Sequence, residues 1–278
     1  MRIAIIGMGL IGTSVARAAR RAWPSLEISE IDRDQPLDSA SGAETIVLAA
    51  PVDVNIRFLT EHGRRFAASV ITDVGSSKRA TIAAARAQGL TNFVGGHPMA
   101  GAASSGPAES RGDLFDDKPW FLFPRGPDAR AVARVRAFVE ALRARPVLLE
   151  DDGSEHDRVM AAVSHLPQIV ASTLMAVVGE ATAAGGLEWA SDGLRDTTRL
   201  AAGSADTWSS VLATNREAIR PLLISLANRL QAMANQLDDP QAVQRLFDAA
   251  NVHRRRLIEP QGEPSPSLSA PASADDSS

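Results

Sequence analysis

The chain has 278 residues, which is long for a single hydrophobic core and is typical of two domains. Its net charge of −4 and pI near 5.8 argue against a nucleic-acid or anionic-membrane surface, because both need clustered Lys and Arg. The absence of cysteine excludes a disulfide framework, a thiolate nucleophile and a zinc–thiolate cluster. The first residues predict a strand and not a signal peptide, and no apolar run is long enough for a membrane span. We therefore expect a cytoplasmic enzyme.

A buried strand is predicted at residues 3–6, and it runs directly into a glycine-rich turn. The turn has the G-x-G-x-x-G spacing and consists of Gly7, Gly9, Leu10, Ile11 and Gly12. In dinucleotide-binding folds such glycines allow a close backbone approach to the pyrophosphate, which lies at the positive end of the next helix. The turn therefore predicts a dinucleotide site. The alternative is a glycine-rich turn in a cofactor-free α/β protein.

The sequence has an acidic residue at the position that binds the adenosine ribose in dinucleotide sites. The second strand is predicted at residues 26–31, and Asp32 follows it, twenty residues after Gly12. There it can accept hydrogen bonds from both ribose hydroxyls and repel a 2′-phosphate, so we expect NAD. Arg33 keeps NADP as the alternative. Pro51, after the third predicted strand, is counted with the cofactor-binding residues.

Strands and helix-length segments alternate through the first half of the chain. The further strands are predicted at residues 45–49, 70–74, 93–94, 120–123 and 147–149, and helices at 54–66, 78–88 and 129–142. This alternation predicts right-handed βαβ units, and hence an α/β fold with a doubly wound, mostly parallel Rossmann-type sheet. We place this NAD-binding domain at residues 1–153.

The second half of the chain is different in pattern. Residues 156–183 and 203–258 are rich in Ala and Leu, with helical periodicity and no convincing strand. We therefore predict an all-α helical domain at residues 154–259, for substrate binding and dimerisation. Residues 260–278 carry four prolines and six serines, and we expect them to form a disordered tail.

Two polar loops are predicted beyond the carboxyl ends of the fourth and fifth strands, where ligands bind in such sheets. They are residues 75–78 and 95–101. His97 lies in the second loop, and we expect its ring to be exposed in a crevice, ready to accept the proton when hydride leaves an alcohol. The alternative is a histidine that only binds loop backbone. Ser76 is expected to orient His97 or the substrate hydroxyl, or to cap the following helix.

Seven motifs occur in a fixed order: GMGLIG, TDVGSSK, GGHPMAG, DLFDDKPW, EHDR, VSHLPQ and LRDTTRLAAG, with Trp208 downstream. Over residues 1 to about 225 this order resembles the prephenate/arogenate dehydrogenase family of tyrosine biosynthesis. GGHPMAG and SHLP are not general features of nucleotide-binding folds. The resemblance implies an N-terminal NAD domain, a C-terminal helical domain that forms the homodimer, and oxidative decarboxylation of a small cyclohexadienol substrate.

The resemblance also implies roles for single residues. His97 would contact the substrate hydroxyl, with support from Ser76. Arg199 would bind a substrate carboxylate, and Asp196, three residues earlier, would hold its guanidinium. Trp208 and Asp196 would belong to a network that closes over the pocket. The alternative for Arg199 is a solvated Arg–Asp pair on a helix surface.

Two further residues of the helical half are placed at the substrate site. His165 is expected to face the crevice, and its alternative is a core histidine bonded to backbone. Many relatives have a second histidine where this chain has Gln168, which cannot become cationic, so the choice between prephenate and arogenate stays open. Ala102 and Ala103 stand where some relatives have threonine and glutamate, which predicts a differently built gate.

No metal site is expected, because His62, His156 and His253 have no metal-ligand spacing. Residues 155–157 are interpreted as the acidic start of a helix. We expect a dimeric NAD-dependent prephenate dehydrogenase that gives 4-hydroxyphenylpyruvate and does not bind nucleic acid or membrane. The alternative is an arogenate or dual-specificity enzyme giving tyrosine. A β-hydroxyacid dehydrogenase is a more distant alternative, since residues 156–183 lack its lysine, and so is a silent NAD-binding dimerisation module.

Overall fold

The computed structural model describes residues 1–101 and 106–259. Ala102, Ala103 and the predicted tail at 260–278 lie outside the described residues. By its internal contacts the chain forms two compact units, Met1–Ile219 and Arg220–Ser278, which are considered separately below. The division into domains after residue 153 stays a prediction, since the first unit continues well beyond that residue.

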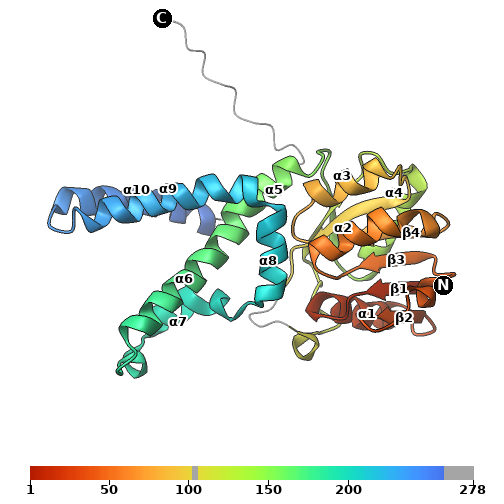
Figure 1. Ribbon diagram of the computed structural model, residues 1–278, viewed down its shortest axis with the longest axis horizontal. Helices are drawn as coiled ribbons and strands as arrows, with labels where there is room; N and C mark the ends of the chain where they lie inside the picture. Colours follow the sequence, from red (N-terminus) through yellow and green to blue (C-terminus); the bar gives the residue numbers. More distant parts are fainter. Residues whose placement is uncertain (102–105, 260–278) are drawn as a thin grey trace, which may run out of the picture. The chain divides into compact units, whose positions relative to one another are not determined.

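The first unit contains a seven-stranded sheet in the order β2-β1-β3-β4-β5-β6-β7. Figure 1 shows its strands β2, β1, β3 and β4 side by side. Its strands are β1 (Arg2–Ile6), β2 (Glu27–Ile31), β3 (Thr45–Leu48), β4 (Val70–Asp73), β5 (Phe93–Pro98), β6 (Pro119–Phe123) and β7 (Arg145–Leu148). All neighbouring strands pair parallel except β5 and β6, which pair antiparallel. The prediction of a doubly wound, mostly parallel sheet is confirmed.

Helices cover both faces of this sheet, as the alternation of β1 requires. Ile3 and Ile5 belong to one buried cluster together with residues of α1 (Leu10–Ala22) and α4 (Ala129–Ala141). Ala4 and Ile6 belong to the other, with residues of α2 (Val52–Glu61) and α3 (Arg79–Ala87). Every apolar residue of β1 is therefore buried against a helix layer. The glycine turn follows β1 directly and so lies at the carboxyl edge of the sheet.

Strand β5 is longer than the sequence predicts. The prediction ended it at residue 94, whereas the structure continues it to Pro98. Gly95 and Gly96 have low intrinsic strand preference, but they pair with Phe123 and Leu122 of β6. His97 is therefore a strand residue opposite Phe121 and not a loop residue.

The described residues after 153 contain helices and no strand, as predicted. In the first unit these are α5 (Ser154–Met160), the π-helical turn η4 (Ala161–His165), α6 (Leu166–Ala181), α7 (Asp192–Thr198), the 3₁₀ turn η6 (Arg199–Ala202) and α8 (Ala205–Thr214). Short 3₁₀ turns η1 (Leu37–Ala40), η2 (Gly63–Phe66), η3 (Pro107–Glu109) and η5 (Leu187–Trp189) lie in the connections. Single π turns inside helices are frequently found at functional sites, and η4 ends at His165.

The second unit consists of most of α9 (Arg216–Ala234) and of α10 (Pro240–Ile258). Asp239 caps α10 by accepting a hydrogen bond from the backbone N–H of Gln241. Large apolar side chains on this unit are exposed, among them Leu230, Phe247 and Leu257. Such uncovered apolar side chains are typical of helices that pack against another chain.

Candidate functional site

The glycine turn has the shape of a phosphate cradle. Gly7 has φ +98°, and a Cβ atom there would lie 2.5 Å from the backbone nitrogen of Ala50. A Cβ atom on Gly12 would overlap the carbonyl oxygen of Gly7. Gly9, in contrast, has no atom within 4 Å of its Cβ position. Two glycines thus let the turn fold tightly, and the third leaves open space beside the backbone.

The amino-terminal end of α1 faces the same turn. Gly9 is its N-cap residue and has no side chain to cap it, while its carbonyl accepts from the N–H of Thr13 at 3.0 Å. The N–H groups of Leu10, Ile11 and Gly12 therefore have no acceptor within the helix. These N–H groups, with the helix dipole, are the donor set that a diphosphate needs.

Asp32 and Pro51 lie beside this cradle, at the ends of the strands that flank β1. Asp32 follows β2, whose Ile31 carbonyl accepts from the N–H of Gly7 at 2.8 Å. The Asp32 side chain is exposed, and one of its oxygens accepts from the N–H of Arg33. Pro51 is the residue before α2. The residues predicted for the cofactor thus come together at one edge of the sheet, and they fit NAD.

The guanidinium of Arg33 points toward α8. It lies 3.9 Å from the carboxylate of Asp206, and both side chains are about four-fifths exposed (81% and 82%). A pair this exposed contributes little to stability. It nevertheless shows that the first turn of α8 lies near Arg33, the residue after Asp32.

A buried ion pair closes the carboxyl end of β4. The Lys78 ammonium and the Asp73 carboxylate are both completely buried and directly hydrogen-bonded. Asp73 also accepts from the backbone N–H of Gly75 and of Gly96, and Lys78 donates to the Gly96 carbonyl at 2.7 Å. Burial lowers the pKa of Lys78, and the neighbouring Asp73 opposes that shift. The pair fixes the Ser76 loop to the strand that carries His97.

Ser76 lies in this loop and is half-buried. The alternative that Ser76 caps α3 is wrong, because Lys78 occupies the N-cap position and the first N–H groups of α3 are bound by Asp157. The neighbouring Ser77 bonds to Thr214 of α8 at 2.8 Å. Over residues 1–101 and 106–259, no hydrogen bond joins Ser76 to His97. Ser76 therefore lies at the carboxyl edge of the sheet, as predicted for a ligand-binding loop. Its hydroxyl neither bonds to His97 nor caps α3.

His97 is buried, which corrects the expectation of a ring exposed in a crevice. Only 8% of the residue is exposed, because β5 carries it under the helical part of the unit. Its Nδ1 lies 2.8 Å from Nε2 of His156. Burial, together with His156, Lys78 and His165, holds the pKa of His97 well below 6.5. His97 is therefore neutral at pH 7, as a proton acceptor must be.

His156 and Asp157 are site residues that the sequence analysis missed, since it read them as an acidic helix start. Both are 2% exposed, and Nδ1 of His156 lies 2.8 Å from the Asp157 carboxylate. The same carboxylate accepts from the backbone N–H of Lys78 and of Arg79. The signal that could have found them is the EHDR motif, whose residues 155–157 were interpreted only as the start of a helix.

His165 is fully buried at the end of the π turn, with its ring edge against Trp208 of α8. Its Nδ1 is 3.1 Å from the side-chain nitrogen of Asn215, and its Nε2 is buried with no partner among the described residues. Burial lowers the pKa of His165 to about 4, opposed by Asp157 and assisted by His156. His165 is thus a neutral ring with a free nitrogen and not a core histidine bonded to backbone.

Gln168 lies one turn further along, in α6. Its amide nitrogen donates to the carbonyl of Leu200 at 2.7 Å and to the hydroxyl of Ser172 at 3.3 Å. A Cβ atom on Gly203 would lie 2.9 Å from the Gln168 amide nitrogen and 2.7 Å from Nε1 of Trp208. His165, Gln168 and Trp208 therefore surround one small region between α6, η6 and α8.

Arg199 and Asp196 are the predicted residues that stay outside this group. Arg199 begins η6, and both side chains are exposed. The part of the chain that the structure describes contains no ion pair between them, so the predicted support of the guanidinium by Asp196 is not made in this conformation. The backbone next to Arg199 is fixed, because the Leu200 carbonyl is held by Gln168.

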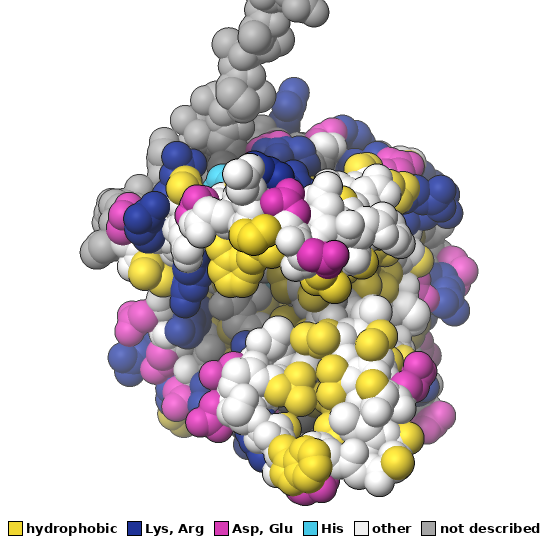
Figure 2. Space-filling view, turned by 90° about the vertical axis from the view of Figure 1, so that its left-hand side faces the viewer, with side chains coloured by type: hydrophobic (Ala, Val, Ile, Leu, Met, Phe, Trp, Pro, Cys, Tyr) yellow, Lys and Arg dark blue, Asp and Glu magenta, His cyan; other side chains and the backbone are white. Residues whose placement is uncertain are grey.

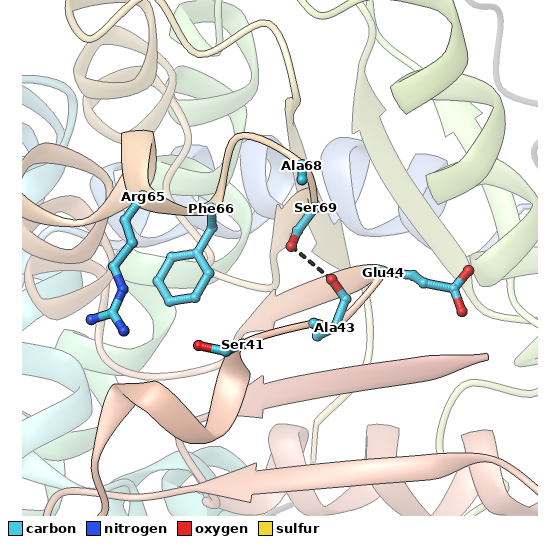
Figure 3. A pocket seen from close by; sticks show the side chains of 8 residues that line it. Ser41, Ala43, Glu44, Arg65, Phe66, Ala68 and Ser69 are labelled. Carbon is cyan, nitrogen blue, oxygen red and sulfur yellow. Dashed lines mark hydrogen bonds between the residues drawn. The ribbon is translucent and has the colours of Figure 1, made fainter.

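A surface pocket lies elsewhere on the sheet. It has a volume of about 290 Å³ and is lined by residues 41–44, Arg65, Phe66, Ala68 and Ser69, where the Ser69 hydroxyl donates to the Ala43 carbonyl (Figure 3). These residues precede β3 and β4, so the pocket is at the amino ends of the strands, opposite the glycine turn. It contains no residue of the predicted site. Among the described side chains, no group of three or more His, Asp or Glu is placed to hold a metal ion.

Two family models match this chain in succession. "Prephenate dehydrogenase, nucleotide-binding domain" matches residues 7–148, and "Prephenate dehydrogenase, dimerization domain" matches residues 152–249. The chain belongs to the prephenate dehydrogenase family. This confirms the resemblance drawn from the seven motifs, and it confirms that residues 7–148 form a nucleotide-binding domain.

Individual relatives of the family agree. The chain is 30% identical to a prephenate dehydrogenase of Lactococcus lactis subsp. cremoris, over 92% of its own length and 77% of the relative's. Among solved structures, the arogenate dehydrogenase of Synechocystis is 26% identical, with a TM-score of 0.70, and the alignment covers 93% of this chain and all of that one. The prephenate dehydrogenase of A. aeolicus, solved with hydroxyphenyl propionate and NAD+, shares the fold at 21% identity and a TM-score of 0.78, over 92% of this chain and 98% of that one.

Proposed function

We propose that the chain catalyses the NAD-dependent oxidative decarboxylation of prephenate to 4-hydroxyphenylpyruvate, with release of carbon dioxide. The observation that carries this proposal, beside membership of the family, is the neutral, buried His97 at the carboxyl edge of the sheet that also holds the glycine turn. A base at this edge is what the oxidation of a ring alcohol needs.

The reaction divides into tasks that single residues can perform. Prephenate has a ring hydroxyl, and its ring becomes aromatic when a hydride leaves the hydroxyl-bearing carbon and a carboxylate leaves as carbon dioxide. NAD, when bound, supplies the hydride acceptor. His97 takes the hydroxyl proton as the hydride leaves and returns it to the same oxygen when the ring becomes aromatic, and Ser76, on the adjacent loop, orients the hydroxyl. The electrons of the broken carbon–carbon bond stay in the ring, so the substrate itself supplies much of the driving force.

Two side chains support the binding of the dianionic substrate. Arg199, exposed at the start of η6, is free to form a bidentate pair with a carboxylate. The side-chain nitrogen of Asn215 can only donate, so Nδ1 of His165 accepts and its Nε2 carries the proton. That buried, unpartnered N–H is a donor for a polar group of the substrate. From the family pattern, Asp196 and Trp208 are also assigned to the substrate site.

Gln168 favours a second candidate substrate, arogenate. Its amide hydrogens are directed to Leu200 and Ser172, which leaves the amide oxygen as the acceptor at this position. Arogenate has an ammonium group, which donates hydrogen bonds, where prephenate has a ketone, which accepts them. An acceptor at this position is therefore better matched to arogenate. The solved arogenate dehydrogenase among the relatives is consistent with this candidate.

The active form is proposed to be a homodimer through the helical half. Among the described residues one helix, Ser154–Ala181, is long and apolar enough to cross a membrane, which corrects the expectation that no apolar run reaches that length. One such helix is weak evidence for a span. Val163, Val177 and Trp189 are more than half exposed, and Figure 2 shows hydrophobic side chains grouped on the helical part. A matching dimerization domain explains these side chains without a membrane, and we expect a cytoplasmic enzyme.

The test is the formation of NADH by the purified full chain, followed by its near-ultraviolet absorbance, with prephenate and arogenate compared at equal concentrations. Turnover of prephenate with the higher kcat/KM supports the primary proposal. A higher kcat/KM for arogenate moves the assignment to the second candidate. No turnover of either substrate, in protein that binds NAD, contradicts both.

A further inference from the structure

We propose that Asp157 and His156 form a hydrogen-bonded chain that fixes the tautomer of His97, so that Nδ1 of His97 carries the proton and Nε2 faces the substrate with its lone pair. Asp157 and His156 are then positioning residues, since neither is required to touch the substrate. The proposal rests on the proposed function, which makes His97 the base.

The hydrogen-bonded chain starts at the carboxylate of Asp157, which acts only as an acceptor. The Asp157 oxygens accept from the backbone N–H of Lys78 at 2.7 Å and of Arg79 at 3.0 Å, at the positive end of α3. An Asp carboxylate has only acceptor oxygens to offer in these hydrogen bonds. Nδ1 of His156, 2.8 Å from the same carboxylate, must therefore donate.

The remaining protons follow from the chemistry of neutral imidazole, which has one N–H and one lone pair. Because Nδ1 of His156 donates, its Nε2 accepts. Nδ1 of His97, 2.8 Å from that Nε2, is then the donor. The lone pair of His97 is left on Nε2, which is the atom free to take a proton from the substrate.

The surroundings of His156 leave it little freedom to turn. Its ring meets Phe123 edge to face at a centroid distance of 5.4 Å and an angle of 90°, and Phe121 at 5.8 Å and 77°. The backbone of Asp157 is held by the side chain of Asn215, which donates to its carbonyl at 2.7 Å. With about 2% of His156 and of Asp157 exposed, water does not compete for these hydrogen bonds.

Two variants of His156 separate a positioning role from a packing role. His156→Phe keeps the aromatic packing and removes both hydrogen bonds. His156→Gln can keep both, because the Asp157 carboxylate attracts the amide N–H and turns the amide oxygen toward Nδ1 of His97. We expect kcat to fall by about 10²-fold in His156→Phe, with KM for NAD unchanged, and to recover at least in part in His156→Gln.

The tautomer itself can be read from the ¹⁵N shifts of the full chain labelled at its five histidines, at neutral pH with NAD present. The signal of His97 is the one missing from His97→Asn. We expect a protonated Nδ1 and an unprotonated Nε2 in the wild-type protein, and a mixture of tautomers in His156→Phe. A proton on Nε2 in the wild type, or an unchanged tautomer and kcat in His156→Phe, overturns the proposal. If the wild type turns over neither substrate, the proposed function fails, while the spectra still decide the tautomer.

Discussion

The side-chain nitrogen of Asn215 lies 3.1 Å from Nδ1 of His165 and 2.7 Å from the backbone carbonyl of Asp157. One buried amide, at the end of α8, therefore holds both the histidine of the proposed substrate region and the residue that ends the hydrogen-bonded chain to His97. The two histidines are neutral for the same reason, namely burial, and their neutrality has consequences for stability.

His165 makes the free energy of unfolding depend on pH. Its pKa is about 4 in the folded chain and 6.5 for an unperturbed histidine, so between these values the unfolded chain binds a proton that the folded chain does not. Stability must then fall as the pH falls from about 6.5 to about 4, by about 3 kcal/mol from this residue. Urea unfolding at a series of pH values measures the slope.

The matched variant for this prediction is His165→Gln, which keeps hydrogen-bonding atoms but cannot titrate. We expect a shallower loss of stability over the same pH range than in the wild type. If the free energies of unfolding of the wild type and of His165→Gln fall in parallel between pH 6.5 and 4, the pH dependence of stability does not come from His165.

Replacing only one member of the buried Asp73–Lys78 ion pair should strongly lower the free energy of unfolding. Lys78→Met leaves the buried Asp73 carboxylate with only backbone donors, which costs about 3 to 5 kcal/mol. The double variant Lys78→Met/Asp73→Leu removes both charges and should cost less than the sum of the two single changes. A double-mutant cycle by chemical denaturation measures this coupling. Additive costs would mean that the two charges do not depend on each other.

Gly153 controls how closely α5 approaches α3. Its φ is +90°, and a Cβ atom there would lie 2.6 Å from the backbone nitrogen of Arg79. Gly153→Ala should therefore lower stability by about 1 to 3 kcal/mol and also lower kcat, since it pushes Asp157 away from the start of α3. Gly89→Ala is the control, because Gly89 has φ +67° but open space around its Cβ position. Equal effects of the two changes on kcat would refute the close-approach argument.

Arg199 should act on substrate affinity. Arg199→Ala removes the proposed carboxylate ligand and should raise KM for the substrate, at a cost of about 2 to 5 kcal/mol if the pair is desolvated in the complex. KM for NAD should not change. Arg195→Ala, on the preceding helix and also exposed, is the matched control. An Arg199→Ala enzyme that saturates like the wild type would make Arg199 a surface residue.

The sequence predicts the parts of this molecule that depend on local pattern. The glycine turn, Asp32 and the alternation of strands and helices are local, and all seven strands occur where they were expected, with small differences at their ends except in β5. The length of β5 was wrong because its extension depends on pairing with β6, about 25 residues later, and local glycine preference cannot show that.

The site was harder to predict because its chemistry depends on contacts between distant segments. His97 and His156 are 59 residues apart in the sequence, and Lys78 and Asp157 are 79 apart. Without knowledge of these contacts, His156 and Asp157 looked like an ordinary helix start, and a helix cap stayed open as the alternative role of Ser76. The family pattern identified His97, but its place in β5, its burial and its partner His156 depend on contacts between distant segments.

The central claim is that His97 is the base, and the most direct test is His97→Asn. The full chain carrying this change should bind NAD as tightly as the wild type, since the glycine turn is untouched, while turnover of the preferred substrate should fall by about two to four decades. Both quantities can be followed in one set of samples, by titration with NAD and by the rate of NADH formation. A variant that binds NAD and turns over at the wild-type rate would contradict the account.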